Sequence, residues 1–291
     1  MFKQVFNRWF RNSIDEVTWE LIEKANDKTT TSLTDKLNKM EKETLFIAFS
    51  TQKGGVGKTA FTVLTASYLH YVQGLEIAVV DCDYPQHSIV EMRRRDMEQV
   101  MKDNYYKKMA YNQFTALKRK AYPVEKSLPE DAISTAEKLI DNAASQPDII
   151  FFDLPGTLNS KGVVKTLAGM DYIFSPVSAD RVVLESTLKF ATMLNENLVS
   201  VGKSNIKGLY LIWNMVDGRE KNELYKVYEN VIGELGLNIL KTFVPDSKRF
   251  RRELTSGHRP VFRSTLFPAH NTLLKGSNLD VLVTEILQII K

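Results

Sequence analysis

The sequence has few of the features that mark secreted, membrane-spanning or disulfide-stabilised proteins. Its 291 residues include a single cysteine, Cys82, so the chain cannot form an internal disulfide. No uninterrupted apolar stretch approaches the ~20 residues that a membrane-spanning helix needs. The N-terminus lacks the long apolar core and small-residue cleavage site of a secretory signal. We therefore expect a cytoplasmic protein.

The modest net charge of +4 conceals two strongly basic segments. Residues 93–126 carry ten Lys and Arg against four Asp and Glu, and residues 241–263 carry seven against two. The remainder of the chain therefore has a balance of −7. Basic segments on an otherwise acidic protein indicate a polyanionic partner, although solvated helix faces would give the same composition.

Short apolar runs alternate with longer helical patterns from residue 44 onward. The runs are apolar on both faces, which is typical of parallel strands covered on both sides. Their repetition predicts a doubly wound, mostly parallel α/β sheet with helices on both faces, and ligands of such sheets bind at the carboxyl ends of the strands. The expected strands are residues 44–50, 76–83, 148–156, 171–177, 208–217 and 238–246.

Two regions depart from this alternation. Residues 1–42 predict an N-terminal helical arm and a polar linker ahead of one domain at residues 43–291. The arm's bulky apolar residues recur at helical spacing, which fits a helix packed on protein or one lying on a membrane surface. Residues from about 88 to 146 are polar, aromatic and basic without a convincing strand, and we expect a helical insert there. The apolar residues of the arm are Phe2, Val5, Phe6, Trp9 and Phe10.

The first expected strand ends in a glycine-rich loop, "QKGGVGKT", that predicts a phosphate-binding site. Gly54, Gly55 and Gly57 let the backbone curl so that successive N–H groups face an anion. A helix that begins near Lys58 adds the positive end of its dipole. Lys58 would reach the β- and γ-phosphates, and the Thr59 hydroxyl would bind Mg²⁺. The expected nucleotide-binding residues of this loop are Gly54, Gly55, Val56, Gly57, Lys58, Thr59 and Ala60.

The loop is a variant, because Gln52 stands where the general P-loop pattern has glycine and Lys53 is an additional cation. It resembles the deviant Walker A motif of the ParA/MinD group of P-loop ATPases, the SIMIBI class. The resemblance implies a fold of that class and a sandwich homodimer of two ATP-loaded subunits. Lys58 would serve its own nucleotide, and Lys53 would act catalytically on the phosphates bound to the opposite subunit. Neutralisation of the triphosphate would then be complete only in the dimer.

Two acidic motifs follow in the order that this family shows. "VVDCDYPQ" resembles its switch I motif, which implies that Asp83 positions or activates the attacking water and that Asp81 lies near Mg²⁺. Tyr84 is an insertion relative to that motif. "IIFFDLPG" resembles Walker B, so Asp153 would hold Mg²⁺ and Gly156 would lie near the γ-phosphate. The implied cofactors are ATP and Mg²⁺, with Thr59, Asp81 and Asp153 at the metal.

Two later motifs match the part of the family site that holds the base. "LYLIWN" ends in Asn214, which matches an asparagine whose amide reads the adenine edge, because an amide both donates and accepts hydrogen bonds. "FVPD" places Pro245 and Asp246 in a loop that would close over base and sugar. A strand-end asparagine is also a common turn former, and that alternative stays open.

The second basic segment directly follows this loop. Family members that dimerise on ATP bind DNA non-specifically through surface Lys and Arg, contacts that need no base reading and weaken with salt. The expected DNA-binding residues are Lys248, Arg249, Arg251, Arg252, Arg259 and Arg263. The tyrosines interleaved with the basic residues of 93–126 fit core packing of the insert as well as base stacking.

The resemblance as a whole implies a ParA-like ATPase with weak intrinsic activity. It would support partitioning, positioning or transfer of DNA, as in conjugative elements, and would be nucleoid-associated. A ParB-like or other partner protein would stimulate hydrolysis.

Other ATPase groups that share this fold are alternatives to a ParA-like protein. The alternative is a membrane-surface, MinD-like positioning ATPase, although "NLDVLVTEILQIIK" at the C-terminus is more typical of a core-packed helix, which makes a membrane partner the weaker expectation. A single cysteine argues against the iron-protein branch, and the absence of tyrosines after Tyr228 argues against the tyrosine-kinase branch. An amidating synthetase remains open but lacks a visible substrate motif. Retention of Lys53, Asp83 and Asp153 argues against a non-hydrolysing scaffold.

Overall fold

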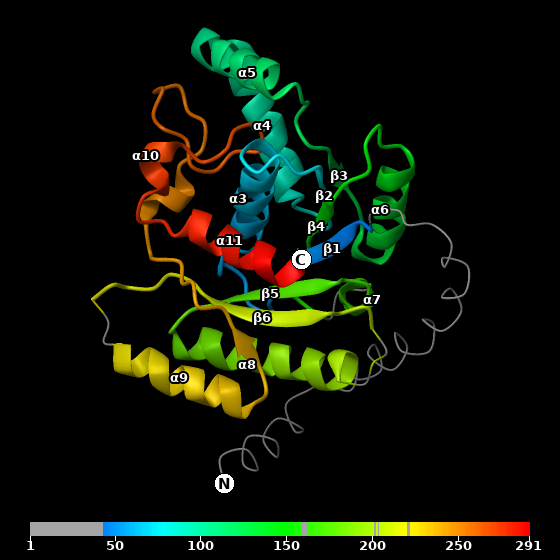
Figure 1. The fold of residues 1–291 in the computed structure, drawn as a ribbon, viewed down its shortest axis with the longest axis vertical. Helices are drawn as coiled ribbons and strands as arrows, with labels where there is room; N and C mark the ends of the chain where they lie inside the picture. Colours follow the sequence, from blue (N-terminus) through cyan, green and yellow to red (C-terminus); the bar gives the residue numbers. More distant parts are fainter. Residues whose placement is uncertain (1–42, 159–161, 201, 203, 220–221) are drawn as a thin grey trace.

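The computed structural model describes residues 43–158, 162–200, 202, 204–219 and 222–291, so the predicted arm of residues 1–42 lies outside it. A seven-stranded sheet in the order β3-β2-β4-β1-β5-β6-β7 forms its centre (Figure 1). Within the described residues every pair of neighbouring strands is parallel, which confirms the predicted doubly wound α/β fold. The strands are β1 (Leu45–Phe49), β2 (Ile77–Asp81), β3 (Val124–Lys126), β4 (Ile149–Asp153), β5 (Tyr172–Val177), β6 (Gly208–Trp213) and β7 (Asn238–Ile239).

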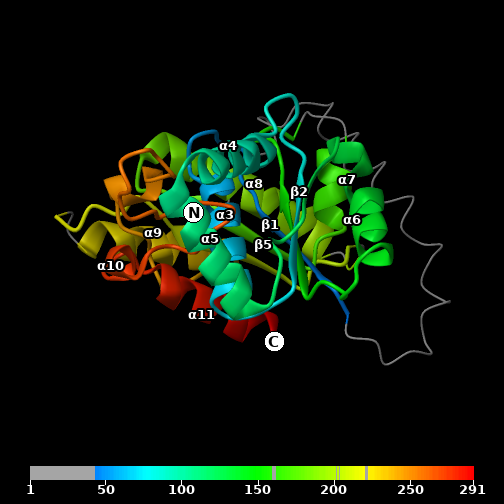
Figure 2. The ribbon, with the colours of Figure 1, turned by 90° about the horizontal axis from the view of Figure 1, so that it is seen from above.

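Helices cover both faces of this sheet (Figures 1 and 2). Successive residues of a strand enter opposite cores, as the pleat requires: Ile47 and Phe49 pack with α3 and α11, whereas Ala48 packs with α7 and α8. Both cores are apolar, which explains why the strands lack polar alternation. The helices are α3 (Lys58–Tyr71), α4 (Ser88–Lys102), α5 (Asn104–Leu117), α6 (Ala132–Asp141), α7 (Val163–Ala168), α8 (Arg181–Leu194), α9 (Asn222–Glu234), α10 (Asn271–Leu274) and α11 (Leu279–Ile290).

The sheet edges differ from the prediction. We expected no strand between residues 88 and 146, but β3 pairs with β2 at one edge, so that expectation was wrong. Its three residues, with Glu125 and Lys126 exposed, form too short and too polar a run to be recognised. At the other edge only Asn238–Ile239 of the expected strand pairs regularly, followed by an isolated bridge between Val216 and Pro245.

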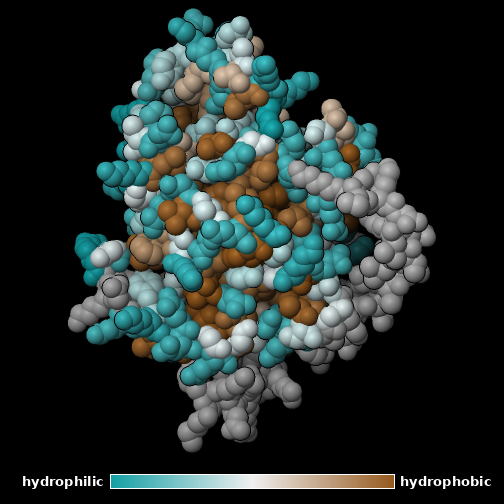
Figure 3. Space-filling model, viewed as in Figure 1, coloured by the Kyte–Doolittle hydropathy of each residue, from teal (hydrophilic) through white to brown (hydrophobic). Residues whose placement is uncertain are grey.

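The region predicted as an insert contains the helices α4, α5 and α6 together with β3, and α5 projects at the end of the molecule (Figures 1 and 3). Tyr106 of α5 is buried against Val261 and Phe267, and Tyr122 lies in the core beside α3. Tyr105 and Tyr111 are exposed. The tyrosines of the basic segment are thus divided between core packing and the surface.

A buried carboxylate fastens α4 to the C-terminal part of the chain. Asp96 accepts hydrogen bonds from the Ser264 hydroxyl at 3.0 Å, the Thr265 amide at 2.7 Å and the Thr265 hydroxyl at 2.8 Å. Arg93, one turn earlier, donates to the Thr265 hydroxyl at 2.9 Å and to the Tyr122 carbonyl. The insert and residues 261–267 therefore form one packed unit beside α3.

The last helix lies in the core. Leu282, Val283 and Ile286 of α11 are fully buried and pack with α3, which agrees with the expectation of a core-packed C-terminal helix. Of the helices in the described ranges, none combines the length and apolarity needed to cross a bilayer.

We predict that Asp96→Ala lowers the free energy of unfolding by roughly 2–4 kcal/mol, because the Thr265 amide and two hydroxyls lose their buried acceptor. Glu98→Ala on the same helix is the control. Its carboxylate is exposed and pairs only with Arg94 and Lys102, so the expected change is about 0.5 kcal/mol. Urea unfolding measures both, and equal effects would contradict this reading of Asp96.

Candidate functional site

The glycine-rich loop lies at the carboxyl edge of the sheet, between β1 and α3. Gly55 has φ +77° and Gly57 has φ +94°, a backbone region that favours glycine. A Cβ at Gly57 would also lie 3.1 Å from the Asn214 amide nitrogen. α3 begins immediately afterwards at Lys58, so its unpaired N-terminal N–H groups and positive dipole end face the loop. The local geometry is that of an anion cradle.

Two lysines occupy different positions on this cradle. The Lys58 ammonium is half-buried and donates to the Lys53 carbonyl at 3.3 Å. Burial lowers the pKa of Lys58, an effect that the nearby charges of Asp153 and Asp83 oppose. Gly156 lies against this group, since a Cβ there would come 2.9 Å from the Lys58 nitrogen. Lys53 is half-buried, and its ammonium has no hydrogen bond or ion pair to any described residue.

The carboxylate of Asp153 lies in the interior of the site, as does that of Asp81. It lies at the end of β4, is fully buried, and accepts a hydrogen bond from the Thr59 hydroxyl at 2.8 Å. Its other oxygen, Oδ1, has no partner among the described residues. Burial raises the pKa of Asp153 to about 7; the Thr59 hydroxyl opposes the shift and the charges of Asp81 and Asp83 add to it.

The two acids of the predicted switch I motif have different surroundings. Asp81, opposite Asp153 on the neighbouring strand, caps α4: one oxygen accepts from the Ile89 and Val90 amides at 2.9 and 3.0 Å. Its other oxygen accepts from the Asp83 amide at 3.2 Å. Asp83 is half-buried, and burial raises its pKa, which the charge of Lys58 opposes. No described residue donates a hydrogen bond to the Asp83 carboxylate, and the charge of Lys58 is near enough to act on it.

Mg²⁺ is held in proteins by one or two carboxylates together with phosphate oxygens and water. Thr59 and the unpartnered oxygen of Asp153 fit this donor set, because both present oxygen at the base of the anion cradle. Both carboxylate oxygens of Asp81 accept hydrogen bonds from backbone amides, so Asp81 would contact a metal ion through a water molecule rather than directly. The described residues contain no cluster of three or more His, Cys, Asp or Glu suited to a metal ion. Phosphate and water would complete the coordination.

A cavity of about 170 Å³, here called the Asn214 cavity, opens beside the loop. The Asn214 amide donates to the Val56 carbonyl at 2.9 Å, which fixes the end of β6 to the glycine loop and leaves its oxygen as an acceptor. The structure thus brings Asn214, Pro245 and Asp246 together with the loop, as the sequence predicted. Arg251, predicted to bind DNA, also lines this cavity. Further wall residues had no motif to mark them: Phe61, Leu64, Met215, Ser247 and Phe250. Several are sequence neighbours of residues that were predicted, which is the one signal that could have found them.

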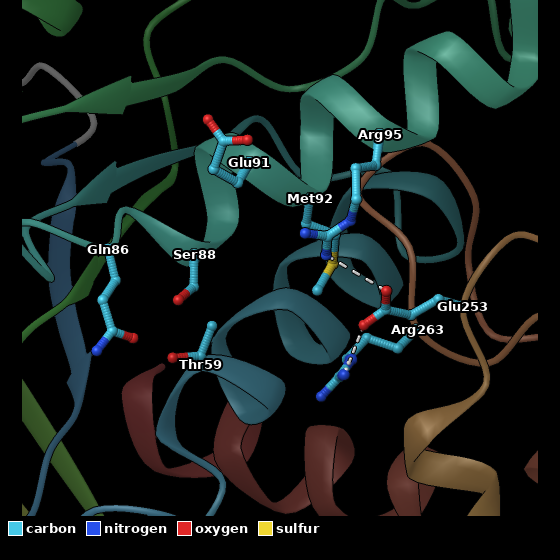
Figure 4. A pocket seen from close by; sticks show the side chains of 8 residues that line it. All are labelled: Thr59, Gln86, Ser88, Glu91, Met92, Arg95, Glu253 and Arg263. Atoms are coloured by element: carbon cyan, nitrogen blue, oxygen red, sulfur yellow. Dashed lines mark hydrogen bonds and ion pairs between the residues drawn. The ribbon is translucent and has the colours of Figure 1, made fainter.

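A second cavity of about 420 Å³, here called the Thr59 cavity, lies between the start of α3 and the start of α4 (Figure 4). Thr59, Gln86 and Ser88 line one end. At the other end the Glu253 carboxylate forms ion pairs with Arg263 at 2.6 Å and with Arg95 at 3.4 Å. Sequence reasoning identified Thr59 and Arg263 but not the cavity they share.

The six basic residues predicted to bind DNA separate into two groups. Lys248, Arg251, Arg252 and Arg259 have exposed side chains. Arg249 instead donates to the carbonyls of Leu273 and Lys275 at 2.8 and 2.6 Å, and Arg263 is paired with Glu253. The exposed four form the part of the basic segment that is free to meet a polyanion.

A protein-family comparison matches residues 47–261 to the CobQ/CobB/MinD/ParA nucleotide binding domain. The chain belongs to this family. Its members are nucleotide-binding ATPases, and the matched region contains the glycine loop, both acidic motifs, Asn214 and Asp246. The resemblance to ParA and MinD that the motifs indicated is confirmed.

Solved structures of ParA and MinD proteins share the fold at low identity. MinD, a cell division ATPase of Pyrococcus furiosus, has a TM-score of 0.52 at 17% identity, covering 85% of this chain and 100% of its own. A putative plasmid partition protein of Borrelia burgdorferi, bound to AMPPNP, has 0.50 at 14%, covering 86% and 98%. The pNOB8 ParA bound to nonspecific DNA has 0.51 at 14%, covering 85% and 99%. No curated protein gives a significant sequence match.

The raised pKa of Asp153 makes a pH-dependent prediction. The unfolded carboxyl titrates near 3.8 and the folded one near 7, so the folded state holds the proton to higher pH and stability falls as pH rises between these values. Without metal or nucleotide, Asp153→Asn should therefore stabilise the protein at pH 8 by roughly 1–4 kcal/mol, and the gain should shrink toward pH 4. Urea unfolding in EDTA from pH 4.5 to 8 measures this, with exposed Asp141→Asn as control. A pH-independent difference would contradict the assignment.

Proposed function

We propose that this chain is a nucleotide-switched ATPase of the ParA type. It dimerises on binding ATP with Mg²⁺, binds DNA without sequence preference in that state, and is released after hydrolysis that a ParB-like or other partner stimulates. Its task is the partitioning, positioning or transfer of DNA on the nucleoid. Membership of the nucleotide-binding family supports the first step, and the site geometry supports the rest as follows.

The observation that carries the proposal is the difference between the contacts of the two lysines, Lys53 and Lys58. Lys58 points back into its own loop, between the Lys53 carbonyl and Gly156, where it would bind the β- and γ-phosphates of the same subunit. Lys53 has no partner within the described chain although it borders the same anion cradle. A second ATP-loaded subunit would supply the phosphate charge that Lys53 lacks here, so dimerisation would complete the site.

The remaining groups have roles that follow from their positions. Thr59 and Asp153 would hold Mg²⁺, which neutralises developing phosphate charge when it is bound. Asp83 would orient the attacking water, since it is the acid beside Lys58 that has no hydrogen-bond donor. Asp81 would act indirectly, by holding Asp83 and the start of α4 in place.

DNA binding is supported by the exposed cations Lys248, Arg251, Arg252 and Arg259, which follow the loop that lines the Asn214 cavity. The pNOB8 ParA with this fold was solved on nonspecific DNA. The alternative remains a membrane-surface, MinD-like positioning ATPase, since MinD of Pyrococcus furiosus has the same fold. ATP-dependent sedimentation with anionic liposomes, but no binding to DNA, would favour that alternative.

We predict that Lys53→Ala leaves ATP affinity of the monomer within about threefold of wild type but abolishes ATP-driven dimerisation, because its contact is made across the dimer. Lys58→Ala should lose ATP binding itself, by more than about 100-fold, because it removes the cation of the cradle. Isothermal calorimetry and light scattering with ATP and Mg²⁺ measure the two steps. A Lys53→Ala protein that still dimerises with ATP would overturn this account of the second lysine.

We predict that Arg252→Ala and Arg259→Ala each weaken ATP-dependent DNA binding about equally on unrelated sequences. Each should lower the slope of log affinity against log salt by about 1, because a phosphate contact releases counterions and reads no base. Exposed Lys138→Ala on α6 is the control, and fluorescence anisotropy with random-sequence duplexes is the measurement. Unchanged slopes in both arginine variants would exclude these residues from the interface.

A further inference from the structure

Arg263 lies where the two cavities of the site meet. It is a wall residue of both the Asn214 cavity and the Thr59 cavity, and no other residue is shared by the two. The Asn214 cavity is also lined by Ala60, and the Thr59 cavity by Thr59, so Arg263 borders the same two cavities as the first turn of α3. Figure 4 shows its side chain at the Glu253 end of the Thr59 cavity.

The backbone on both sides of Arg263 is fixed. The amides of Phe262 and Arg263 both donate to the Arg252 carbonyl at 2.9 Å, and Phe262 is fully buried. The next two residues, Ser264 and Thr265, are held by the buried carboxylate of Asp96. The position of the guanidinium is therefore determined by the core rather than by a loose surface loop.

The guanidinium is only partly satisfied. One terminal nitrogen donates to Glu253 at 2.6 Å, while the Nε atom is buried and has no acceptor among the described residues. A buried donor without an acceptor is costly, and an arginine presents its donors as a planar fork suited to phosphate. The side chain is 22% exposed, so it is open to a small ligand in the cavities but poorly placed for the backbone of duplex DNA.

We propose that Arg263 contacts the bound nucleotide at its α-phosphate and that Glu253 positions it; this inference rests on the proposed binding of ATP. The loop amides and the start of the following helix hold the α- and β-phosphates in P-loop sites. Arg263 borders the cavities lined by Thr59 and Ala60, at the start of that helix. The Asn214 cavity is the expected site of the base, and the Thr59 cavity contains an expected metal ligand, so Arg263 lies between the two. The ribose and α-phosphate lie between the base and the metal, and only the phosphate carries the charge that a guanidinium matches.

Glu253 has a positioning role because it bridges two arginines. Its Oε1 accepts from Arg263 and its Oε2 pairs with Arg95 of α4 at 3.4 Å. Without Glu253, Arg263 would lose the anchor that orients its fork. Because Glu253 also pairs with Arg95 of α4, a nucleotide bound to Arg263 would alter the contacts of the insert, which begins directly after the switch I motif.

The test is calorimetric titration of the full chain with ATP and with ADP, both in the presence of Mg²⁺. We expect Arg263→Ala to weaken both nucleotides by the same factor, roughly 10- to 100-fold, since both carry the α-phosphate. Lys138→Ala, which removes an exposed cation of α6 that lines neither cavity, is the control and should change affinity less than twofold. Arg263→Lys should recover part of the loss, because it restores charge but not the planar fork.

Glu253→Gln tests the positioning role. It should weaken both nucleotides by a smaller factor, and it should have no further effect in the Arg263→Ala background, because its influence passes through that side chain. An undiminished effect of Glu253→Gln in that background would overturn the positioning role.

Three outcomes would overturn the contact itself. The first is an Arg263→Ala affinity within twofold of the Lys138→Ala affinity. The second is a loss confined to ATP, which would place Arg263 at the γ-phosphate. The third is wild-type nucleotide affinity of Arg263→Gln. The last variant keeps a hydrogen bond to Glu253 without the charge and replaces Arg263→Ala if that protein does not fold. If wild type binds ATP and Lys58→Ala does not while Arg263→Ala is normal, the inference fails and the proposed function stands. If wild type binds no ATP, both fail.

Discussion

Negative charge buried at the carboxyl edge of the sheet is the constraint on which the site depends. Asp81 and Asp153 end neighbouring strands and are fully buried, with Asp83 close by. Asp81 is satisfied by the backbone amides at the start of α4, whereas Asp153 keeps one oxygen without a partner. Such an arrangement is unfavourable until a cation arrives, and the glycine loop with Lys58 is in turn an anion site. A metal ion with a phosphate ligand satisfies both, which explains why the two motifs occur together.

The same segment of chain serves the nucleotide site and the proposed DNA surface. Pro245, Asp246, Ser247, Phe250 and Arg251 line the Asn214 cavity. Arg252 and Arg259 are exposed, and Arg263 lines both cavities. Asp96 ties the end of this segment to α4, and α4 starts from the cap that Asp81 provides. These contacts link the proposed nucleotide site, the switch I motif and the basic surface through short, packed connections. A change in the nucleotide has a direct structural route to the residues proposed to meet DNA.

Much of the fold and site was readable from sequence because its signals are local. Doubly buried strands have apolar runs, and a loop such as Gly54–Lys58 has few other uses. The central strands and the loop between β1 and α3 could therefore be predicted, and the roles of the loop and acidic residues stay predictions. β3 was missed because an edge strand of three residues has no apolar period to reveal it. Arg249 and Arg263 were grouped with exposed arginines because composition does not distinguish a solvated cation from one held by carbonyls or by Glu253. Those partners lie 10 to 26 residues away, and only the fold brings them together.

The most direct test of the central claim is the affinity of the full chain for random-sequence duplex DNA with ATP, with ADP and without nucleotide, each at low and moderate salt. The account predicts tight binding only with ATP and Mg²⁺, and a steep loss as salt rises. Equal binding in all three nucleotide states would contradict it, because the basic segment would then act independently of the nucleotide site. Absence of binding in every state would also contradict it and would leave a membrane or protein cargo as the alternative.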